Sequence, residues 1–245
     1  MLLKSWEKLP DMLRIDEVRP YYDTLRRKSV SLLLKRAVDV VCSLLMLCLL
    51  SPLFAVLALA VKLDSPGPVF FRQTRITQYG RTFRIFKFRT MVSDADRRGG
   101  AVTLLSDARI TRVGARIRHL RLDEIPQLIN VLFGQMSFVG TRPEVLDYVR
   151  RYSPEMRATL LLPAGITSTA SVEFRDEDTL LQAAEQADEV YVRDILPQKM
   201  AYNLEDLRRF SLWRDLRILL RTVTRVFGQR KARTQETETS KSNDG

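Results

Sequence analysis

The sequence contains few of the residues on which several protein classes depend. Its 245 residues include two cysteines and one histidine, His119. Two cysteines exclude a disulfide-rich scaffold, and with a single histidine they exclude most zinc sites. One histidine also argues against a Ser-His-Asp hydrolase.

Acidic residues are in deficit as well. Lys and Arg total 40 against 29 Asp and Glu, which gives a formal net charge of +11, and 45% of the residues are hydrophobic. That hydrophobic fraction excludes a disordered chain, and the length allows one sizeable domain or one domain with appendages. The positive charge predicts an anionic partner, which could be nucleic acid, anionic lipid or a phosphorylated small molecule.

Charge is absent altogether from residues 40–61, which read VVCSLLMLCLLSPLFAVLALAV. This segment is just long enough to cross a hydrocarbon core of roughly 30 Å as one straight helix. Both cysteines, Cys42 and Cys48, lie within it and are interpreted as small apolar side chains. A buried core helix is one alternative, which the length of the apolar run disfavours. A signal peptide is another, but it would be about twice the usual 15–30 residues.

The flanks of the apolar segment predict how it meets a membrane. Both flanks are strongly basic, with Lys35 and Arg36 upstream and seven Lys or Arg between residues 62 and 89 downstream. A straight helix would place one basic flank on the disfavoured side, whereas a helix that enters and returns keeps both flanks cytoplasmic.

Ser51 and Pro52 lie at the centre of the segment. Proline costs about 3 kcal/mol in a helix interior, and the Ser51 hydroxyl can donate to a carbonyl freed near Leu47. We therefore expect a re-entrant helix over residues 31–62, in which Ser51-Pro52 divides the apolar run 40–61 into two legs of about 11 residues, or roughly 16 Å each. A kinked helix that spans the whole membrane remains the alternative.

Residues 69–76 and 81–91 predict a β-hairpin around Gln78-Tyr79-Gly80. On the second strand Phe83, Ile85, Lys87 and Arg89 share one face, an alternation that suits a nucleotide or a phosphate. The alternative is an ordinary amphipathic strand whose basic side chains face water.

Apolar residues at helical spacing predict three further helices. The first covers 110–120, and the second begins near Ile125 and ends near Gly134. A longer one covers 204–227, with an apolar side made by Leu207, Phe210, Trp213, Leu216, Leu220 and Val223. This last helix could lie flat on an anionic membrane or dock on the domain. Residues 136–144 are interpreted as a tight loop that carries Arg142, and residues 173–189 as a solvated acidic face.

Asp123 and Glu124 form the main chemical candidate, together with Arg118, Arg121 and Arg142. Adjacent residues on a helix point about 100° apart, so the two carboxylates cannot face each other across a sugar as in a glycosidase. A carboxylate at a helix N-terminus can instead attack phosphorus and form an aspartyl-phosphate, while the helix dipole and the guanidinium groups hold the phosphate. Carboxylates also bind Mg²⁺ that bridges a diphosphate. The alternative is that Asp123 only caps the helix.

An ordered series of motifs then resembles the bacterial sugar transferases, the monotopic phosphoglycosyl transferases that begin glycan assembly. The similarity covers about residues 31–225 and depends on the order of many short blocks. They are Lys35-Arg36-Ala37-Val38-Asp39, Ser51-Pro52, residues 65–73, Phe86-Lys87-Phe88-Arg89-Thr90-Met91, Arg118 with residues 122–127, residues 136–140 with Arg142-Pro143, and Gly165-Ile166-Thr167.

The resemblance implies an α+β, mostly helical, monotopic membrane protein with a re-entrant helix broken at Ser51-Pro52, a small β-hairpin and amphipathic interfacial helices. Together with the sequence pattern, it divides the chain into an N-terminal segment 1–30 of unassigned role, the re-entrant helix 31–62 and a cytoplasmic catalytic domain 63–228, and the polar composition of residues 229–245 predicts a disordered tail. It also implies that the protein lies on the cytoplasmic face of the bacterial inner (plasma) membrane, in a form close to the minimal catalytic unit.

The implied reaction transfers a sugar-1-phosphate from a UDP-sugar to a polyprenyl (undecaprenyl) phosphate and releases UMP, with Mg²⁺. The resemblance assigns Asp123 as the nucleophile and Glu124 to metal or proton handling, so both are candidate metal ligands. Arg118 and Arg142 are expected near the phosphates, and Lys87 and Arg89 complete the phosphate-binding set. The product would begin an exopolysaccharide, a capsule, an O-antigen (lipopolysaccharide) or a glycoprotein glycan.

Two departures from the family pattern leave the sugar open. Thr141 stands where many members have proline, and the stretch after Thr167 differs from their usual sequence. Nucleic acid is not expected as a partner, and a homo-oligomer stays open.

Two other function classes remain as alternatives. A basic nucleic-acid-binding protein would show salt-sensitive DNA affinity, and the apolar segment argues against it. A signal-anchored exported hydrolase would use Asp123 and Glu124 and would place the chain ends on opposite faces of the membrane.

Overall fold

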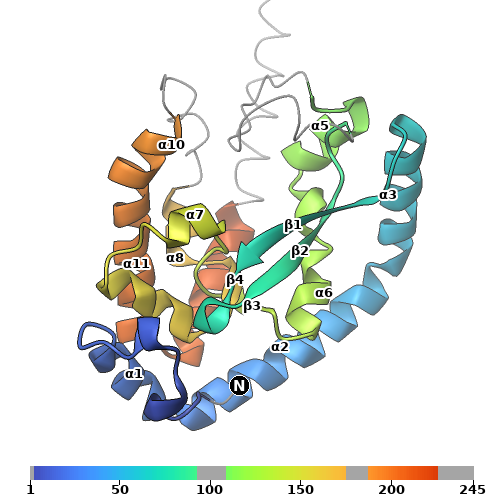
Figure 1. Cartoon of the computed structure of the whole chain (residues 1–245). Helices are drawn as coiled ribbons and strands as arrows, with labels where there is room; N and C mark the ends of the chain where they lie inside the picture. Colours follow the sequence, from blue (N-terminus) through green and yellow to red (C-terminus); the bar gives the residue numbers. More distant parts are fainter. Residues whose placement is uncertain (1–2, 93–108, 175–186, 226–245) are drawn as a thin grey trace, which may run out of the picture.

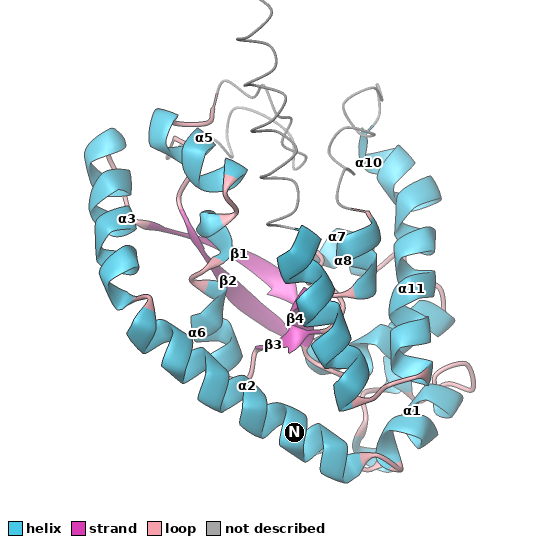
Figure 2. Ribbon diagram, turned by 180° about the vertical axis from the view of Figure 1, so that it is seen from behind, coloured by secondary structure: helices cyan, strands magenta, loops and turns pink. Residues whose placement is uncertain are grey.

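A computed structural model of the chain describes residues 3–92, 109–174 and 187–225. The fold is mostly helical, as expected, and contains two small sheets, of which only the hairpin was predicted. Two long helices form an arc along one side of the molecule, and α10 (Ala187–Val190) and α11 (Leu196–Arg208) stand on the other side. The sheets lie between them in both views (Figures 1 and 2).

The arc consists of α2 (Ser29–Leu49) and α3 (Ser51–Asp64), which are bent by 63° at Leu50. Pro52 lies in the first turn of α3, where its missing N–H leaves no hydrogen bond unmade. The Ser51 hydroxyl donates to the Cys48 carbonyl at 2.8 Å. The predicted break is therefore confirmed. The Ser51 hydroxyl bonds to the carbonyl of Cys48, one residue after the Leu47 carbonyl that was expected.

The two legs of the arc have the length and composition of a membrane segment only when taken together. No single helix among the described residues is long and apolar enough to cross a membrane, but the bent pair passes the same test. The outer side of α2 exposes a row of apolar residues, namely Val30, Leu33, Leu34, Val38, Val41, Leu44, Leu45, Met46 and Leu49. Its inner side buries Leu32, Lys35, Asp39 and Ser43.

The predicted β-hairpin is confirmed. Strands β1 (Phe70–Ile76) and β2 (Thr82–Phe88) are antiparallel, with Phe70 opposite Phe88 and Ile76 opposite Thr82. The connecting turn places Tyr79 at φ 61° and Gly80 at φ 74°. Consecutive left-handed residues give a turn the twist that suits a hairpin.

A second sheet corrects the prediction of a loop over residues 136–144. Met136–Val139 form strand β3, which pairs in parallel with β4 (Ala164–Thr167). A Cβ on Gly165 would lie 2.2 Å from the Gly140 nitrogen, so only glycine allows this approach of the two chains. The sequence pattern missed this pair because each strand has only four residues.

Two helices lie between the arc and the hairpin. The first is α5 (Arg112–His119), and the second is α6 (Gln127–Leu132), which ends before Gly134 at φ 74°. Both were expected, but Leu120 is exposed and does not join the apolar side of α5. Ile117 instead packs with Leu57 and Val61 of α3 and with Phe88 of β2.

The first thirty residues contribute to the largest hydrophobic core. They form two single 3-10 turns, Trp6–Lys8 and Asp11–Leu13, and helix α1 (Arg19–Arg26). Leu13, Tyr21 and Leu25 are buried against α11 and against the 3-10 segment Glu155–Leu161. The segment for which the sequence suggested no role thus completes this core. The remaining short elements are α7 (Leu146–Val149), α8 (Thr169–Glu173) and a π turn at Tyr191–Ile195.

The single helix expected over 204–227 is wrong. The chain leaves α11 after Arg208, inserts Phe210 into the core and begins a second helix at residue 212. The Ser211 hydroxyl accepts a hydrogen bond from the Arg214 nitrogen and so caps the new helix. Because of this break, Leu207 and Phe210 are buried while Trp213 is 77% exposed. Leu216, Leu220 and Val223 are exposed as well.

The expectations for residues 175–186 and 229–245 lie outside the described residues.

Candidate active site

Glu124 lies at the centre of the candidate site. Its Oε1 accepts a hydrogen bond from the Lys87 ammonium at 2.9 Å and another from the Arg142 guanidinium at 2.7 Å. Lys87 comes from β2, Glu124 from the 3-10 turn Leu122–Glu124, and Arg142 from the loop after β3. Three segments distant in the sequence therefore meet at one carboxylate oxygen.

These contacts fix the charge of Glu124. Burial by itself would raise the pKa of this carboxyl, but the adjacent Arg142 and Lys87 cations lower it well below its usual range. Glu124 is consequently ionised at neutral pH and holds both cations, of which Lys87 also acts on Asp123. A permanently ionised carboxylate cannot serve as a general acid.

Asp123 has the opposite electrostatic character. Burial and the neighbouring Glu124 charge raise its pKa, against the opposing influence of Lys87 and Arg118. No other residue in the described ranges donates a hydrogen bond to its carboxylate, and the side chain is only half-buried. Asp123 is thus a carboxylate with raised basicity.

The structure corrects the idea that Asp123 caps a helix. It lies in the 3-10 turn Leu122–Glu124, and Pro126 occupies the N-cap position of α6. Arg121, at φ 52°, turns the chain out of α5 into this 3-10 turn, and its own side chain is exposed. Leu122 packs against the cluster of Leu57, Phe88 and Ile117. The turn that carries Asp123 is therefore supported by α3 and β2.

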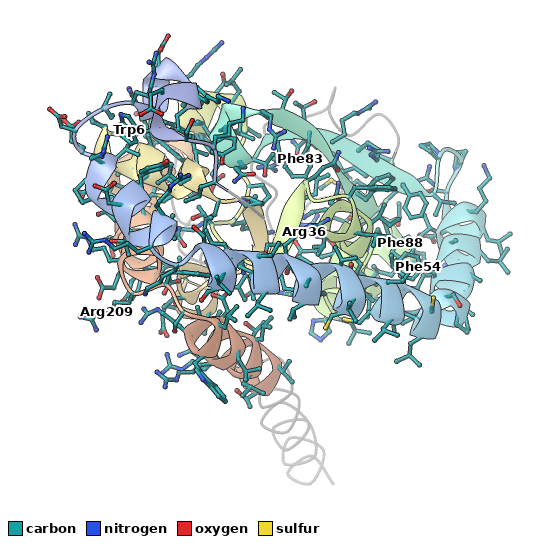
Figure 3. The ribbon with its side chains drawn as sticks, turned by 90° about the horizontal axis from the view of Figure 1, so that it is seen from below. Trp6, Arg36, Phe54, Phe83, Phe88 and Arg209 are labelled. Carbon is teal, nitrogen blue, oxygen red and sulfur yellow. The ribbon has the colours of Figure 1, made fainter. Side chains whose placement is uncertain are left out.

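Arg89 lies apart from this group. It is 4% exposed, and its guanidinium donates to the backbone carbonyls of Val61, Ser65 and Pro66. The neighbouring Phe88 lies against Phe54 of α3, with ring centroids 5.5 Å apart (Figure 3). The structure thus gives Arg89 contacts that attach the end of α3 to the hairpin, whereas Lys87, Arg118 and Arg142 surround the two carboxylates.

Three charged residues of α2 have structural roles that the sequence did not suggest. Arg36 donates to the carbonyls of Val131 and Leu132 at the end of α6 (Figure 3). Lys35 donates to the Val139 carbonyl at 2.9 Å and to Asp215 at 2.6 Å.

Asp39 completes the set. Its Oδ1 accepts from the Ser137 hydroxyl and from the Phe138 nitrogen, both at 3.1 Å. The available signal was the presence of three charges at the start of an otherwise apolar helix. All three lie on the side that faces the domain.

The chemistry of two carboxylates at this site is compatible with a divalent cation, although they do not form a complete set of ligands. Among the described residues there is no cluster of three or more His, Cys, Asp or Glu that would hold a metal alone. Asp123 and Glu124 supply two carboxylates, and the hydrogen bonds to Glu124 go to Oε1. Mg²⁺ is commonly bound by one or two carboxylates together with substrate phosphates.

Comparisons of the sequence with known proteins find a family and several relatives. A family model described as bacterial sugar transferase matches residues 30–229. A UDP-glucose:undecaprenyl-phosphate glucose-1-phosphate transferase of Escherichia coli K12 is 37% identical over 219 residues, which cover 88% of this chain and 44% of that protein.

Two further relatives differ in their named roles. A UDP-N-acetylgalactosamine-undecaprenyl-phosphate N-acetylgalactosaminephosphotransferase of Aeromonas hydrophila is 33% identical, covering 91% of this chain and 52% of its own length. An exopolysaccharide production protein of Rhizobium leguminosarum bv. phaseoli is 36% identical over 79% of this chain and 95% of its own. The chain thus spans about half the length of the Escherichia and Aeromonas relatives.

Proposed function

Because this chain belongs to the bacterial sugar transferase family, we propose that it transfers a sugar-1-phosphate from a UDP-sugar to a polyprenyl phosphate. The observation that carries the proposal is the Asp123 carboxylate, which has a raised pKa and lies among Lys87, Arg118 and the Arg142–Glu124 pair. The names of the relatives specify this class of donor and acceptor.

The first step is attack of an Asp123 carboxylate oxygen on the β-phosphorus of the UDP-sugar. A bond forms between this oxygen and phosphorus, and the bond from phosphorus to the bridging oxygen breaks, so UMP leaves with the electron pair. Lys87, Arg118 and Arg142 offset the charge of the diphosphate. The raised pKa of Asp123 makes its ionised carboxylate a stronger nucleophile.

The second step returns the enzyme to its starting state. An oxygen of the polyprenyl phosphate attacks the phosphorus of the aspartyl phosphosugar, and the Asp123 carboxylate leaves. Two displacements avoid bringing a nucleotide diphosphate and a lipid phosphate, both anions, into the site together.

Asp123 and Glu124 would hold a magnesium ion together with the substrate diphosphate. When bound, Mg²⁺ supplies charge neutralisation on the phosphate oxygens. Glu124 also keeps Lys87 and Arg142 in place through its two hydrogen bonds. Because Glu124 stays ionised, it cannot itself be the protonated carboxylic acid that a glycosidase requires.

The arc of α2 and α3 is proposed to enter the cytoplasmic face of the inner membrane and to return from it. The exposed apolar row on α2 and the bend of 63° support this arrangement. A re-entrant helix also keeps Asp123 at the depth where the lipid phosphate lies. Single cysteines near residues 5 and 225 should both react with a membrane-impermeant thiol reagent only from the cytoplasmic side. Reaction from opposite sides would refute the re-entrant arrangement.

Covalent trapping tests the chemistry directly. Purified protein incubated with a UDP-sugar labelled in the sugar, without lipid, should carry the label and release UMP. Asp123→Asn should abolish both signals. Asp147→Asn, which changes an exposed aspartate on α7, is the matched control and should label normally. Label on the Asp123→Asn variant, or turnover without any protein adduct, would refute the proposed intermediate.

The sugar and the glycan are the least determined parts of the proposal. The relatives are named for glucose and N-acetylgalactosamine donors, and one is named for exopolysaccharide production. We propose that this chain begins the assembly of a surface glycan such as an exopolysaccharide. UMP release from a panel of UDP-sugars, measured with undecaprenyl phosphate present, would identify the donor.

A further inference from the structure

The loop that carries Arg142 also carries a buried glutamate with no place in the mechanism above. Glu144 is 7% exposed, and its Oε1 accepts a hydrogen bond from the Tyr191 hydroxyl at 2.5 Å. The buried Lys199 ammonium donates in turn to the Tyr191 oxygen at 3.2 Å. We propose that Glu144 is a positioning residue that fixes the Arg142 guanidinium against Glu124, an inference that rests on the proposed function.

Backbone hydrogen bonds hold both ends of this loop. At its start the Gly140 nitrogen donates to the Thr167 carbonyl, and the Gly165 nitrogen donates to the Thr141 carbonyl, both at 2.9 Å. At its end the Ile76 nitrogen donates to the Glu144 carbonyl at 2.9 Å. Arg142 and Pro143 lie between these attachments, where Arg142 bonds to Glu124 and the Pro143 carbonyl accepts from Arg75.

A second arginine links Glu144 to the middle of the loop. The Arg75 guanidinium lies 4.0 Å from Glu144 Oε2 and donates to the Pro143 carbonyl at 3.4 Å. It is also close enough to Arg142 for the two like charges to repel, which contributes to the lowered pKa of Arg75 after the larger effect of burial. Glu144 offsets the charge of Arg75 on one side, as Glu124 offsets that of Arg142 on the other.

Cations and glutamates therefore alternate on the two sides of the loop that carries Arg142. Lys87 and Arg142 share Glu124, while Arg75 and the Tyr191–Lys199 pair share Glu144. Without the Glu144 charge, Arg75 would lose the anion that offsets it and would repel Arg142 more strongly, so the Arg142 guanidinium would shift relative to Glu124. Misplacement of about 1 Å at a reacting centre can cost about 100-fold in rate.

Glu144→Gln tests this role because it keeps the shape and removes the charge. The expected result is a loss of about 10- to 100-fold in kcat/KM for release of UMP from the donor sugar. Tyr191→Phe removes only the hydroxyl and should lower the same constant by a smaller factor. Glu155→Gln is the control, since Glu155 also accepts from a tyrosine, Tyr21, and pairs with an arginine, Arg208, but its side chain is 46% exposed and lies outside the loop that carries Arg142.

A double-mutant cycle with Arg142→Ala separates positioning from general stability. If Glu144 acts through Arg142, adding Glu144→Gln to Arg142→Ala should lower the rate by no more than about twofold further. The inference would be overturned if the losses of the two single variants multiplied in the double variant, or if Glu144→Gln were as active as the Glu155→Gln control. Sugar-phosphate transfer by the wild-type protein would still support the proposed function in either case. A wild-type protein that releases no UMP from any donor would instead refute the function.

Discussion

The buried ion pair between Lys35 and Asp215 provides the sharpest test of how α2 is attached to the domain. The Lys35 side chain is 5% exposed and that of Asp215 is 16% exposed, and the two are 2.6 Å apart. Lys35→Met keeps the length of the side chain but leaves Asp215 without its cation and the Val139 carbonyl without its donor. Removing one member of a buried pair typically costs about 3–5 kcal/mol.

This cost should depend on pH. Burial raises the pKa of Asp215 although Lys35 lowers it, and the Asp39 and Asp206 charges add to the rise. Without Lys35 the folded state binds the proton on Asp215 more tightly than the unfolded state does. Stability is then lost as pH rises above the ordinary aspartate pKa, so the variant should be closest to wild type in mild acid.

Calorimetric unfolding in detergent micelles would measure the effect. At this chain length the expected loss corresponds to a fall in Tm of roughly 10 °C at pH 8. Lys35→Met combined with Asp215→Leu should recover most of the loss because no uncompensated charge remains.

Arg209→Met, which breaks the exposed Arg209–Glu205 pair, is the control and should cost at most about 1 kcal/mol. A Lys35→Met loss no larger than that of the control, or a double variant no better than the single one, would refute the reasoning.

Two further predictions concern the site itself. Gly165→Ala should lower the free energy of unfolding by about 1–3 kcal/mol and slow adduct formation, because the new Cβ would meet backbone atoms of Gly140; unchanged calorimetry would contradict that contact. Asp123→Asn should raise Tm by a few degrees at pH 7 and by less near pH 4. The reason is that a carboxylate whose pKa is raised in the folded state lowers stability only while it is ionised. A Tm that falls at pH 7 would contradict the raised pKa.

The parts of the fold that were predictable are those whose signal is local. Gln78-Tyr79-Gly80 marks the hairpin turn, Ser51-Pro52 marks the break between α2 and α3, and Gly134 marks the end of α6. Each depends on backbone conformations that a few adjacent residues decide. The single helix over 204–227 failed because periodicity alone did not reveal that Ser211 would cap a new helix.

The candidate site likewise has one part that the sequence predicted and one part that it did not. Its carboxylates and arginines could be named from motifs, but their separate behaviour could not. Asp123 and Glu124 are adjacent in sequence, yet Glu124 accepts hydrogen bonds from Lys87 and Arg142, and the pKa values of the two carboxyls move in opposite directions. Arg89, two residues from Lys87, is drawn instead to the carbonyls at the end of α3.

The sequence by itself determined the helical character, the apolar segment with its break, and the residue types available for phosphate chemistry. Only the tertiary structure decided which charge pairs with which. It joined Lys35 to Asp215, Asp39 to Ser137 and Glu144 to Tyr191, residues separated by 47 to 180 positions. Periodicity and capping act within a few residues, whereas the energy of a buried charge depends on whatever distant group the fold brings beside it.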